Sequence, residues 1–274
     1  MPSIRLQSWP AVAGNKESDL KIAVLGAGAL GCAMGSCLSE AGHEVWLINR
    51  RADHVEAMNR QGLTVRVHGV DRPMPVKAAC HAQDIAAQTG VMDLIVVLVK
   101  SFHTREAMAS ATSIVGPDTV VLSLQNGLGH EDVLAEVVGR DKVVAGKTYA
   151  GGVLLGPGHI IRGTEGKETW IGELDGQVTG RVRHIAEVFN AAGLITRISD
   201  NIMGTMWDKL LVNVATGALS GITRLTYGDL YQVPEVKACA LAAVQEAMDV
   251  ARASGIRLSV SSPEEPWIKA AAGL

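Results

Sequence analysis

The sequence predicts an α/β protein in which a doubly wound, mainly parallel sheet is followed by an all-helical region. Three observations carry this prediction. Short apolar strands alternate with helices from Lys21 onward, which is typical of parallel sheets. A glycine-rich and β-branched stretch then fills residues 142–173. After Asp200 the strand pattern stops, and two long apolar helices are expected instead.

The amino-terminal half begins with a βαβ unit. Residues 1–20 contain two prolines and no sustained hydrophobic period, so we expect a flexible leader there. From Lys21, KIAVLG predicts a buried strand, ALGCAMGSCLSEAG a helix closed by Gly42, and HEVWLIN a second strand.

The later elements repeat this alternation. We expect helices near 52–60, 103–115, 130–138 and 178–192, extended segments at LTVRVHG and MPVKAAC, and strands at DLIVVLVK, TVVLSLQ and LITRIS. Residues 142–173 should add strands and hairpins to the same sheet. Helices near 201–221, with Asp200 as N-cap, and near 234–254 complete the chain. The predicted domains are therefore 21–199 and 200–274.

Composition excludes several classes of protein. The net charge is −3 with both signs scattered, so nucleic acid is not expected as a partner. The apolar runs are too short to span a membrane and no secretion signal is present, which predicts a cytoplasmic protein. The four cysteines form no CxxC pair and the eight histidines no HxH or HExxH motif, so we expect reduced thiols and no metal site. A small molecule is the expected partner, and a homodimer is left open.

The segment GAGALG matches GxGxxG between a predicted strand and helix. In this context the first glycine permits a tight turn, the second lets the backbone approach a pyrophosphate, and the third lets the helix pack on the strand. The alternative is a glycine-rich turn without a ligand. We expect the loop to bind a dinucleotide through Gly26, Ala27, Gly28, Ala29, Leu30 and Gly31.

The residue that distinguishes NAD from NADP is expected at the end of the second strand. An acidic residue there accepts hydrogen bonds from the ribose 2′-hydroxyl of NAD, but the sequence has Arg50, nineteen residues after Gly31. A guanidinium matches a 2′-phosphate, so NADP(H) is the predicted cofactor. Arg51 is either a second phosphate ligand or a solvated surface residue.

Two more polar residues follow predicted strands. Lys100 ends DLIVVLVK, and Asn126 lies in SLQNG. Ligands of open α/β sheets bind outside the carboxyl ends of the strands, so both should lie near the ribose and nicotinamide of the cofactor. Asn126 can also serve the Asn-Gly turn, and the two roles are compatible.

The helix near 201–221 carries polar residues on one stripe. With Lys209 at zero, Asn213, Thr216 and Ser220 lie within about 40° of it. The opposite side is apolar, which predicts a helix buried nearly all round: Trp207, Leu211, Val214, Ala218. Burying an unpartnered ammonium is costly, so Lys209 should face a cleft or a charged ligand. The alternative is a lysine that snorkels from a surface helix.

Five segments together resemble the ketopantoate reductases, which reduce 2-dehydropantoate to pantoate with NADPH in pantothenate synthesis. They are KIAVLGAGALG, EVWLINR, VLVKSF, LQNGLG and MWDKLLVN, in this order and at these intervals. The resemblance runs from about Lys21 to the chain end. It implies a Rossmann domain, a helical carboxyl-terminal domain like that of 6-phosphogluconate dehydrogenase, and an active site between them.

The resemblance also implies roles for individual residues. Lys209 would donate the proton to the ketone oxygen, and Asn213 and Asn126 would bind the substrate. Lys100 and Asn126 would hold the nicotinamide end, and Arg50 the 2′-phosphate. Hydride transfer to a ketone develops negative charge on its oxygen, which an ammonium stabilises and can protonate.

Three departures from the family pattern concern the substrate. Gly217 replaces an asparagine that often follows the position of Asn213, and His103 replaces a frequent glutamine. The family's serine and glutamate would follow Leu274, because Glu264 and Glu265 lie too early. Besides a ketopantoate reductase, we therefore consider an NADPH-dependent reductase of another small 2-ketoacid or opine-type substrate, and a non-catalytic NADP-binding regulator.

Overall fold

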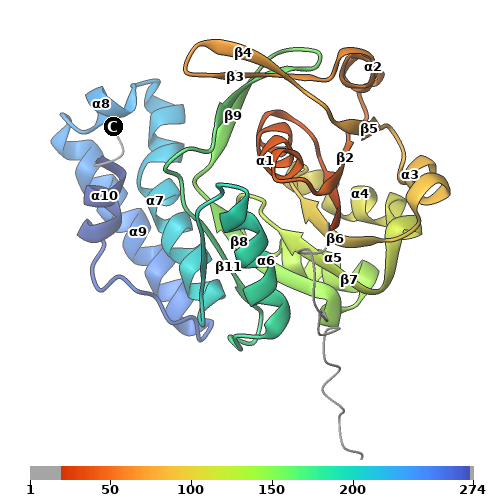
Figure 1. Cartoon of the computed structure of the whole chain (residues 1–274). Helices are drawn as coiled ribbons and strands as arrows, with labels where there is room; N and C mark the ends of the chain where they lie inside the picture. Colours follow the sequence, from red (N-terminus) through yellow and green to blue (C-terminus); the bar gives the residue numbers. More distant parts are fainter. Residues whose placement is uncertain (1–19, 272–274) are drawn as a thin grey trace, which may run out of the picture. The chain divides into compact units, whose positions relative to one another are not determined.

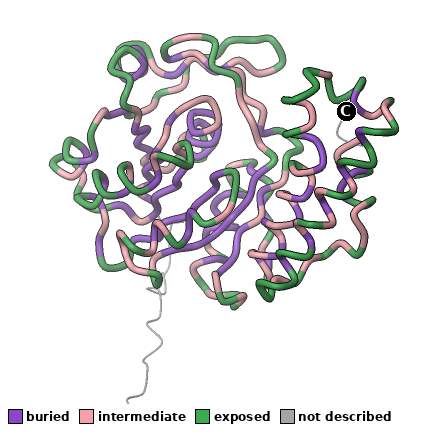
Figure 2. Tube along the Cα trace, turned by 180° about the vertical axis from the view of Figure 1, so that it is seen from behind, coloured by how far each residue is buried: buried purple, intermediate pink, exposed green. Residues whose placement is uncertain are grey.

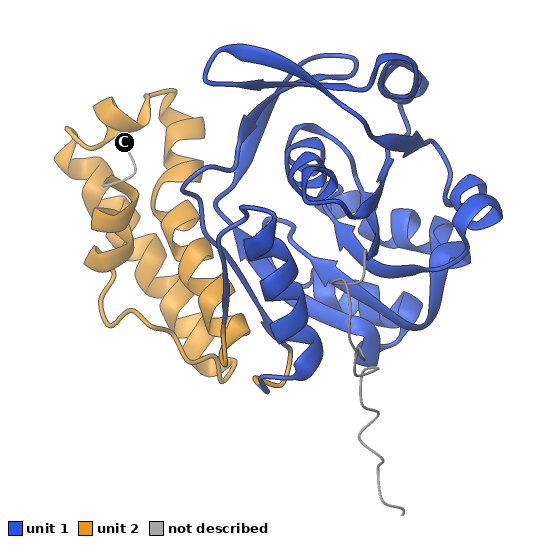
Figure 3. Ribbon diagram, in the orientation of Figure 1, with its two compact units in different colours: residues 1–173, 177–198 blue, residues 174–176, 199–274 orange. Residues whose placement is uncertain are grey.

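The computed structural model describes residues 20–271, so the predicted leader lies outside the described residues except for Leu20. The chain separates into two compact units (Figure 3). The first runs to Glu173 and resumes over Gln177–Ile198, and the second contains Leu174–Gly176 and the chain from Ser199 onward.

The first unit is built on an eight-stranded sheet of order β12-β11-β8-β7-β6-β1-β2-β5 (Figure 1). The strands from β8 to β5 in this order are parallel, and β11 pairs antiparallel with β8. The bounds are β1 Lys21–Leu25, β2 Glu44–Ile48, β5 Lys77–Ala79, β6 Met92–Val97, β7 Val115–Ser123, β8 Val143–Thr148, β11 Thr169–Glu173 and β12 Thr196–Ile198. The predicted parallel α/β fold is confirmed.

The apolar runs explain why these segments form the central strands. Ile22, Val24 and Leu47 are buried, as expected for parallel strands covered on both faces. Helix α1 (Ala29–Glu40) packs on one face of the sheet. At Gly35 an added Cβ would lie 2.5 Å from Cδ2 of Leu47, so glycine lets the helix approach β2 without displacing this side chain. Figure 2 shows the resulting continuous burial of the central strands.

A second sheet corrects one expectation. The segment after β8 does not only extend the main sheet, because β9 and β10 pair with β3 and β4 in a separate sheet of order β4-β3-β10-β9. Here β3 and β10 are parallel, with Thr64 opposite His159. This sheet lies on α1 (Figure 1), whose outer face would otherwise be uncovered. The bounds are β3 Leu63–Val67, β4 Val70–Met74, β9 Gly151–Gly156 and β10 His159–Gly163.

The remaining helices of the first unit follow the predicted order with two differences. The expected helix at 103–115 is split, because the chain forms short 3-10 turns on both sides of a seven-residue helix. A further helix, α3, was not predicted. The bounds are α2 Ala52–Gln61, α3 Ala82–Thr89, η1 Ser101–His103, α4 Thr104–Ser110, η2 Thr112–Ile114, α5 His130–Val138, η3 Arg140–Lys142 and α6 Gly180–Ala191.

The second unit is helical in its described part. It comprises α7 Ile202–Thr223, α8 Tyr227–Leu230, α9 Pro234–Ala253 and α10 Glu264–Ala271. Its core joins α7, α8, α9 and α10 through Leu211, Ala215, Leu230, Val236, Ala240, Val244, Met248 and Trp267. The expectation that α7 is buried nearly all round is wrong, since Ala218 and Ile222 are exposed. Only one face of the helix enters the core.

Asp200 is not the N-cap of α7. The cap position is Asn201, and its side chain makes no capping hydrogen bond. Its amide Nδ2 instead donates to the Arg257 carbonyl at 2.7 Å, while its backbone N–H donates to Ser199 Oγ at 3.0 Å. These bonds anchor the residue before α7 to the Arg257 segment and to Ser199, and they leave the helix start without a side-chain cap. Across residues 20–271, no helix has the length and apolar character that membrane crossing requires.

Candidate functional site

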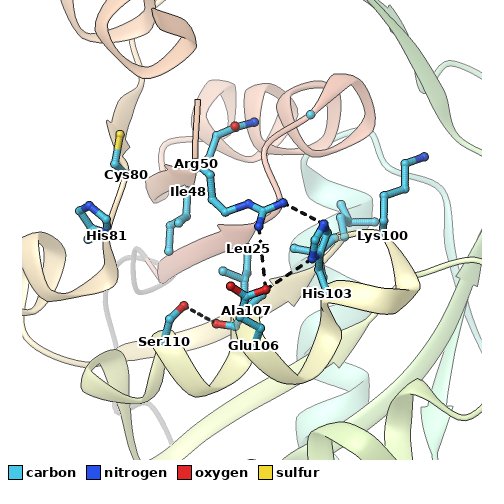
Figure 4. A pocket seen from close by; sticks show the side chains of 15 residues that line it. Leu25, Ile48, Arg50, Cys80, His81, Lys100, His103, Glu106, Ala107 and Ser110 are labelled. Atoms are coloured by element: carbon cyan, nitrogen blue, oxygen red, sulfur yellow. Dashed lines mark hydrogen bonds and ion pairs between the residues drawn. The ribbon is translucent and has the colours of Figure 1, made fainter. Parts of the chain in front are cut away.

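A cavity of about 420 Å³ opens at the carboxyl ends of β1, β2 and β6 (Figure 4). This is the edge at which α/β sheets bind ligands. Its lining combines backbone of the glycine loop, apolar side chains and several charged groups. The lining residues are Leu25, Gly26, Gly28, Ile48, Asn49, Arg50, Cys80, His81, Leu98, Val99, Lys100, His103, Glu106, Ala107 and Ser110.

The three glycines of GAGALG meet three different constraints. Gly26 has φ of +105°, and an added Cβ would lie 2.6 Å from the Val99 backbone nitrogen. A Cβ at Gly31 would lie 2.4 Å from the Gly26 carbonyl oxygen. At Gly28 it would meet nothing within 4 Å, because this residue faces the cavity. The open space at Gly28 fits the close approach of a pyrophosphate to the backbone.

The other loop residues have different surroundings. Ala27 is buried, its N–H donates to the Ile48 carbonyl, and its own carbonyl accepts from Asn49 Nδ2 at 2.7 Å. Ala27 therefore braces the loop and does not line the cavity. Ala29, Leu30 and Gly31 form the first turn of α1. Backbone N–H groups in a first helical turn lack intrahelical partners and favour an anion.

Arg50 follows β2 and enters the cavity. Its Nη2 lies 2.9 Å from Nε2 of His103, and its Nη1 lies 3.9 Å from Oε2 of Glu106. Figure 4 shows these three side chains converging, with Cys80 and His81 on the opposite side. Arg51 is held elsewhere, in a bidentate pair with Asp53 on the surface. The structure thus brings Arg50, and not Arg51, to the cavity.

Lys100 and Asn126 are placed at the ends of neighbouring strands. Lys100 lines the cavity after β6. Asn126 follows β7 on an exposed loop, outside the cavity lining, with Gly127 at φ of +103° as expected for an Asn-Gly turn. The Asn126 carbonyl lies 2.9 Å from Nε2 of His130, which closes the loop.

Gln125, which was not predicted as a site residue, connects these two loops. Its buried Nε2 donates to the Val99 carbonyl at 2.9 Å and to Oγ1 of Thr104 at 2.8 Å. Thr104 in turn donates to the Ser101 carbonyl at 2.8 Å. The segment around Lys100 is therefore tied to the strand end that precedes Asn126. The only sequence signal is a polar residue at the end of a buried strand.

Glu131 is a second missed residue. It lies in the first turn of α5 and is 2% exposed. Neither carboxyl oxygen accepts a hydrogen bond of ordinary geometry from the described residues. Burial raises the pKa of Glu131, and neighbouring His130 and Ser123 only partly offset this effect. The carboxyl group sits behind the end of β7 and does not line the cavity.

The polar residues of the predicted stripe of α7 differ in their contacts and in their exposure. Thr216 donates to the Val212 carbonyl within α7, and Ser220 donates to the Leu225 carbonyl in the segment that follows the helix, so both hydroxyls bond to backbone. Asn213 is exposed. Lys209 is half-buried, and burial lowers the pKa of its ammonium below the ordinary value.

Asp208, the residue before this lysine, was also missed as a structural group. It is buried, and its Oδ1 accepts the backbone N–H of Ser259 at 3.1 Å. Among the described residues, no cluster of His, Cys, Asp or Glu is arranged to hold a metal ion.

Comparison with known protein families gives two matches. Residues 22–176 match the family described as "Ketopantoate reductase PanE/ApbA", and residues 201–273 match its carboxyl-terminal part. The 2-dehydropantoate 2-reductase of Pyrococcus horikoshii is 34% identical over 245 residues, covering 89% of this chain and 78% of that protein. The enzyme of the same name from Halobacterium salinarum is 33% identical, covering 89% and 79%.

Solved structures with the same fold include two informative relatives. A PanE/ApbA family ketopantoate reductase from Ralstonia eutropha JMP134 is 36% identical with a TM-score of 0.78, covering 88% of this chain and 77% of that chain. A D-mandelate dehydrogenase, solved with NADH and anilino(oxo)acetate, is 26% identical with a TM-score of 0.83, covering 92% and 79%.

Proposed function

The chain belongs to the ketopantoate reductase family, and we propose that it reduces 2-dehydropantoate to pantoate with NADPH in pantothenate biosynthesis. The observation that carries this proposal is the cavity at the sheet edge, where open backbone at Gly28 lies in the same space as the guanidinium of Arg50. In this proposal residues 21–199 bind the cofactor and residues 200–274 contribute to the substrate site.

The cavity lining supports a division of roles along the dinucleotide. The first turn of α1 suits the pyrophosphate, because its backbone N–H groups favour an anion. Arg50 suits a 2′-phosphate, because a guanidinium donates two hydrogen bonds to it. Lys100 and Asn126 follow the next strands and are assigned the nicotinamide end. When bound, NADPH supplies the hydride.

Lys209 is the proposed proton donor. Negative charge that develops on the ketone oxygen is stabilised by a nearby ammonium, which then protonates it. Because burial lowers the pKa of Lys209, a negatively charged neighbour such as the substrate carboxylate helps to keep the lysine protonated. The Asn213 amide, four residues along the same helix face, is assigned to substrate binding.

A second candidate substrate class is favoured by one comparison. The solved relative with anilino(oxo)acetate holds a 2-ketoacid analogue with an aromatic substituent. Gly217 supplies no side chain at a position where the family often has an asparagine, and it is exposed in α7. A reductase of a bulkier 2-ketoacid is therefore the alternative.

The test monitors NADPH absorbance with a panel of 2-ketoacids: ketopantoate, ketoisovalerate, pyruvate and phenylglyoxylate. Ketopantoate should give the highest kcat/KM. Preference for phenylglyoxylate would select the alternative substrate class. NADPH binding without turnover of any ketoacid would contradict the proposed enzyme and favour a non-catalytic regulator.

A further inference from the structure

We infer that Glu106 limits the preference of this site for NADPH over NADH, by holding Arg50 when the ribose carries a 2′-hydroxyl and by opposing the 2′-phosphate when it is present. The inference rests on the proposed function, because it concerns the same dinucleotide cavity. In this inference Glu106 of α4 determines cofactor specificity together with Arg50, which follows β2.

The arrangement joins residues from two neighbouring strand ends. Arg50 follows β2, whereas His103 and Glu106 follow β6. Oε2 of Glu106 lies 3.9 Å from Nη1 of Arg50 and 3.5 Å from Nδ1 of His103. All three side chains line the cavity, and Figure 4 shows the guanidinium directed toward the other two. The charges that a ribose 2′ substituent meets are therefore set by this cluster.

The histidine orients the guanidinium. Nε2 of His103 lies 2.9 Å from Nη2 of Arg50. An arginine nitrogen can only donate, so Nε2 accepts in this contact and the Nδ1 proton faces Glu106. His103 thus bridges the arginine and the carboxylate. This bridge keeps the cation beside the carboxylate while no phosphate competes for it.

The ion pair is weak enough for a ligand to replace. The side chains of Arg50 and Glu106 are 70% and 73% exposed, and ion pairs that solvent screens contribute little to stability. A phosphate, with a charge of about −1.5 to −2 and three acceptor oxygens, competes effectively for the same guanidinium. Binding of NADPH therefore exchanges the carboxylate partner of Arg50 for the phosphate.

The exchange leaves Glu106 beside a second anion. A carboxylate close to the 2′-phosphate repels it, and low salt increases this effect. With NADH the situation reverses, because a ribose hydroxyl can donate to a carboxylate as it does at the acidic residue of NAD-binding sites. The cavity thus holds a recognition group for each cofactor, Arg50 for the phosphate and Glu106 for the hydroxyl.

The experiment titrates NADPH and NADH into full-length protein without ketoacid and follows nicotinamide fluorescence. Glu106→Gln removes the negative charge but keeps the size of the side chain. We expect the ratio of the NADH Kd to the NADPH Kd to rise about fivefold or more, through tighter NADPH and weaker NADH binding. The rise should be larger at low than at high ionic strength.

Glu136→Gln is the matched control. Glu136 pairs with Arg105, the residue beside Glu106, and lies outside the cavity lining. The Glu136→Gln substitution removes the same charge from an exposed ion pair. The ratio of the NADH Kd to the NADPH Kd should therefore stay within about twofold of the wild-type ratio. An unchanged ratio in Glu106→Gln, or equal tightening of both dinucleotides, would overturn the role of Glu106 and leave the proposed function intact. If wild-type protein bound neither dinucleotide, both the inference and the proposed cofactor would be wrong.

Discussion

The two units of the chain present their candidate chemistry in different ways. In the first unit the cavity depends on backbone geometry, with Gly26 and Gly31 fixed by contacts that a Cβ would disturb. In the second, the candidate chemistry depends on one charged side chain, Lys209, in a helix that otherwise packs an apolar face. The difference teaches that cofactor affinity and proton donation should respond to separate substitutions.

The largest expected effect comes from Lys209→Ala. The substitution removes the proposed proton donor and the charge beside the developing oxyanion, so kcat should fall by about 10²-fold or more. NADPH affinity should persist, because the cavity lining lies in the first unit. Both are measured on one preparation, by ketoacid-dependent NADPH oxidation and by fluorescence titration.

Lys237→Ala is the control for this substitution. Lys237 is an exposed lysine on α9, so its loss should leave kcat unchanged. A wild-type kcat in Lys209→Ala, accompanied by a lower melting temperature, would show that Lys209 is a structural residue only.

Arg50→Ala tests whether the first unit determines cofactor affinity. NADPH should bind about 10- to 100-fold more weakly, because hydrogen bonds to a charged phosphate each contribute about 1.5–3 kcal/mol. NADH affinity should change much less, and kcat at saturating NADPH should be retained. Equal losses for the two dinucleotides would rule out Arg50 as the group that recognises the 2′-phosphate.

The pH dependence of turnover should also follow Lys209. Burial lowers the pKa of Lys209 from its ordinary value of 10.5. As the pH rises through that lowered pKa, the proton donor is lost and kcat/KM should fall about tenfold per pH unit. A profile that stays flat up to 10.5 would contradict the assignment.

Unfolding measurements test the lowered pKa of Lys209 independently, because the free energy of unfolding should rise with pH where kcat/KM falls. Between the lowered pKa of folded Lys209 and the ordinary value near 10.5, the unfolded chain binds more protons than the folded one. The free energy of unfolding should therefore rise with pH in this window. In Lys209→Met this rise should disappear, and its persistence would assign it to another group.

The smallest effect is expected for Gln125→Met, which removes the amide that ties the Lys100 segment to the end of β7. We expect the KM for NADPH to rise about threefold to tenfold, in addition to a loss of stability from the unpaired Val99 carbonyl. Asn190→Leu is the control, because Asn190 similarly bonds the Ala186 and Thr196 carbonyls, joining α6 to β12. Asn190→Leu should lower only the melting temperature. If the KM for NADPH were the same in Gln125→Met and Asn190→Leu, Gln125 would be a structural residue only.

Features encoded in local sequence were predictable. The strand at Lys21–Leu25, the helix that follows it and the glycine loop between them depend on apolar runs and on glycines within a few residues. The position of Arg50 after the second strand also follows from this spacing. These elements were predicted because each depends on residues close together in the chain.

Contacts between distant segments were not predictable from such patterns. The second sheet requires β3 to meet β10, which no local period specifies. The proximity of Arg50 to His103 and Glu106 depends on how β2 and β6 flank β1 in the sheet. Asn201 caps no N–H of α7 because its side-chain amide donates to the carbonyl of Arg257, which lies far along the sequence. Tertiary placement decided each of these cases.

The parallel pairing of Thr64 with His159 has a consequence for the order of folding. Closing so long a stretch of chain costs entropy before any pairing energy is gained, and such contacts form slowly. The βαβ unit around Gly28 uses shorter connections and can form earlier. Because the second sheet covers α1, the polypeptide emerging from a ribosome should acquire its dinucleotide loop before the cover of that loop's helix. In pulse-labelling hydrogen exchange, the backbone amides of β1 should become protected before those of β10.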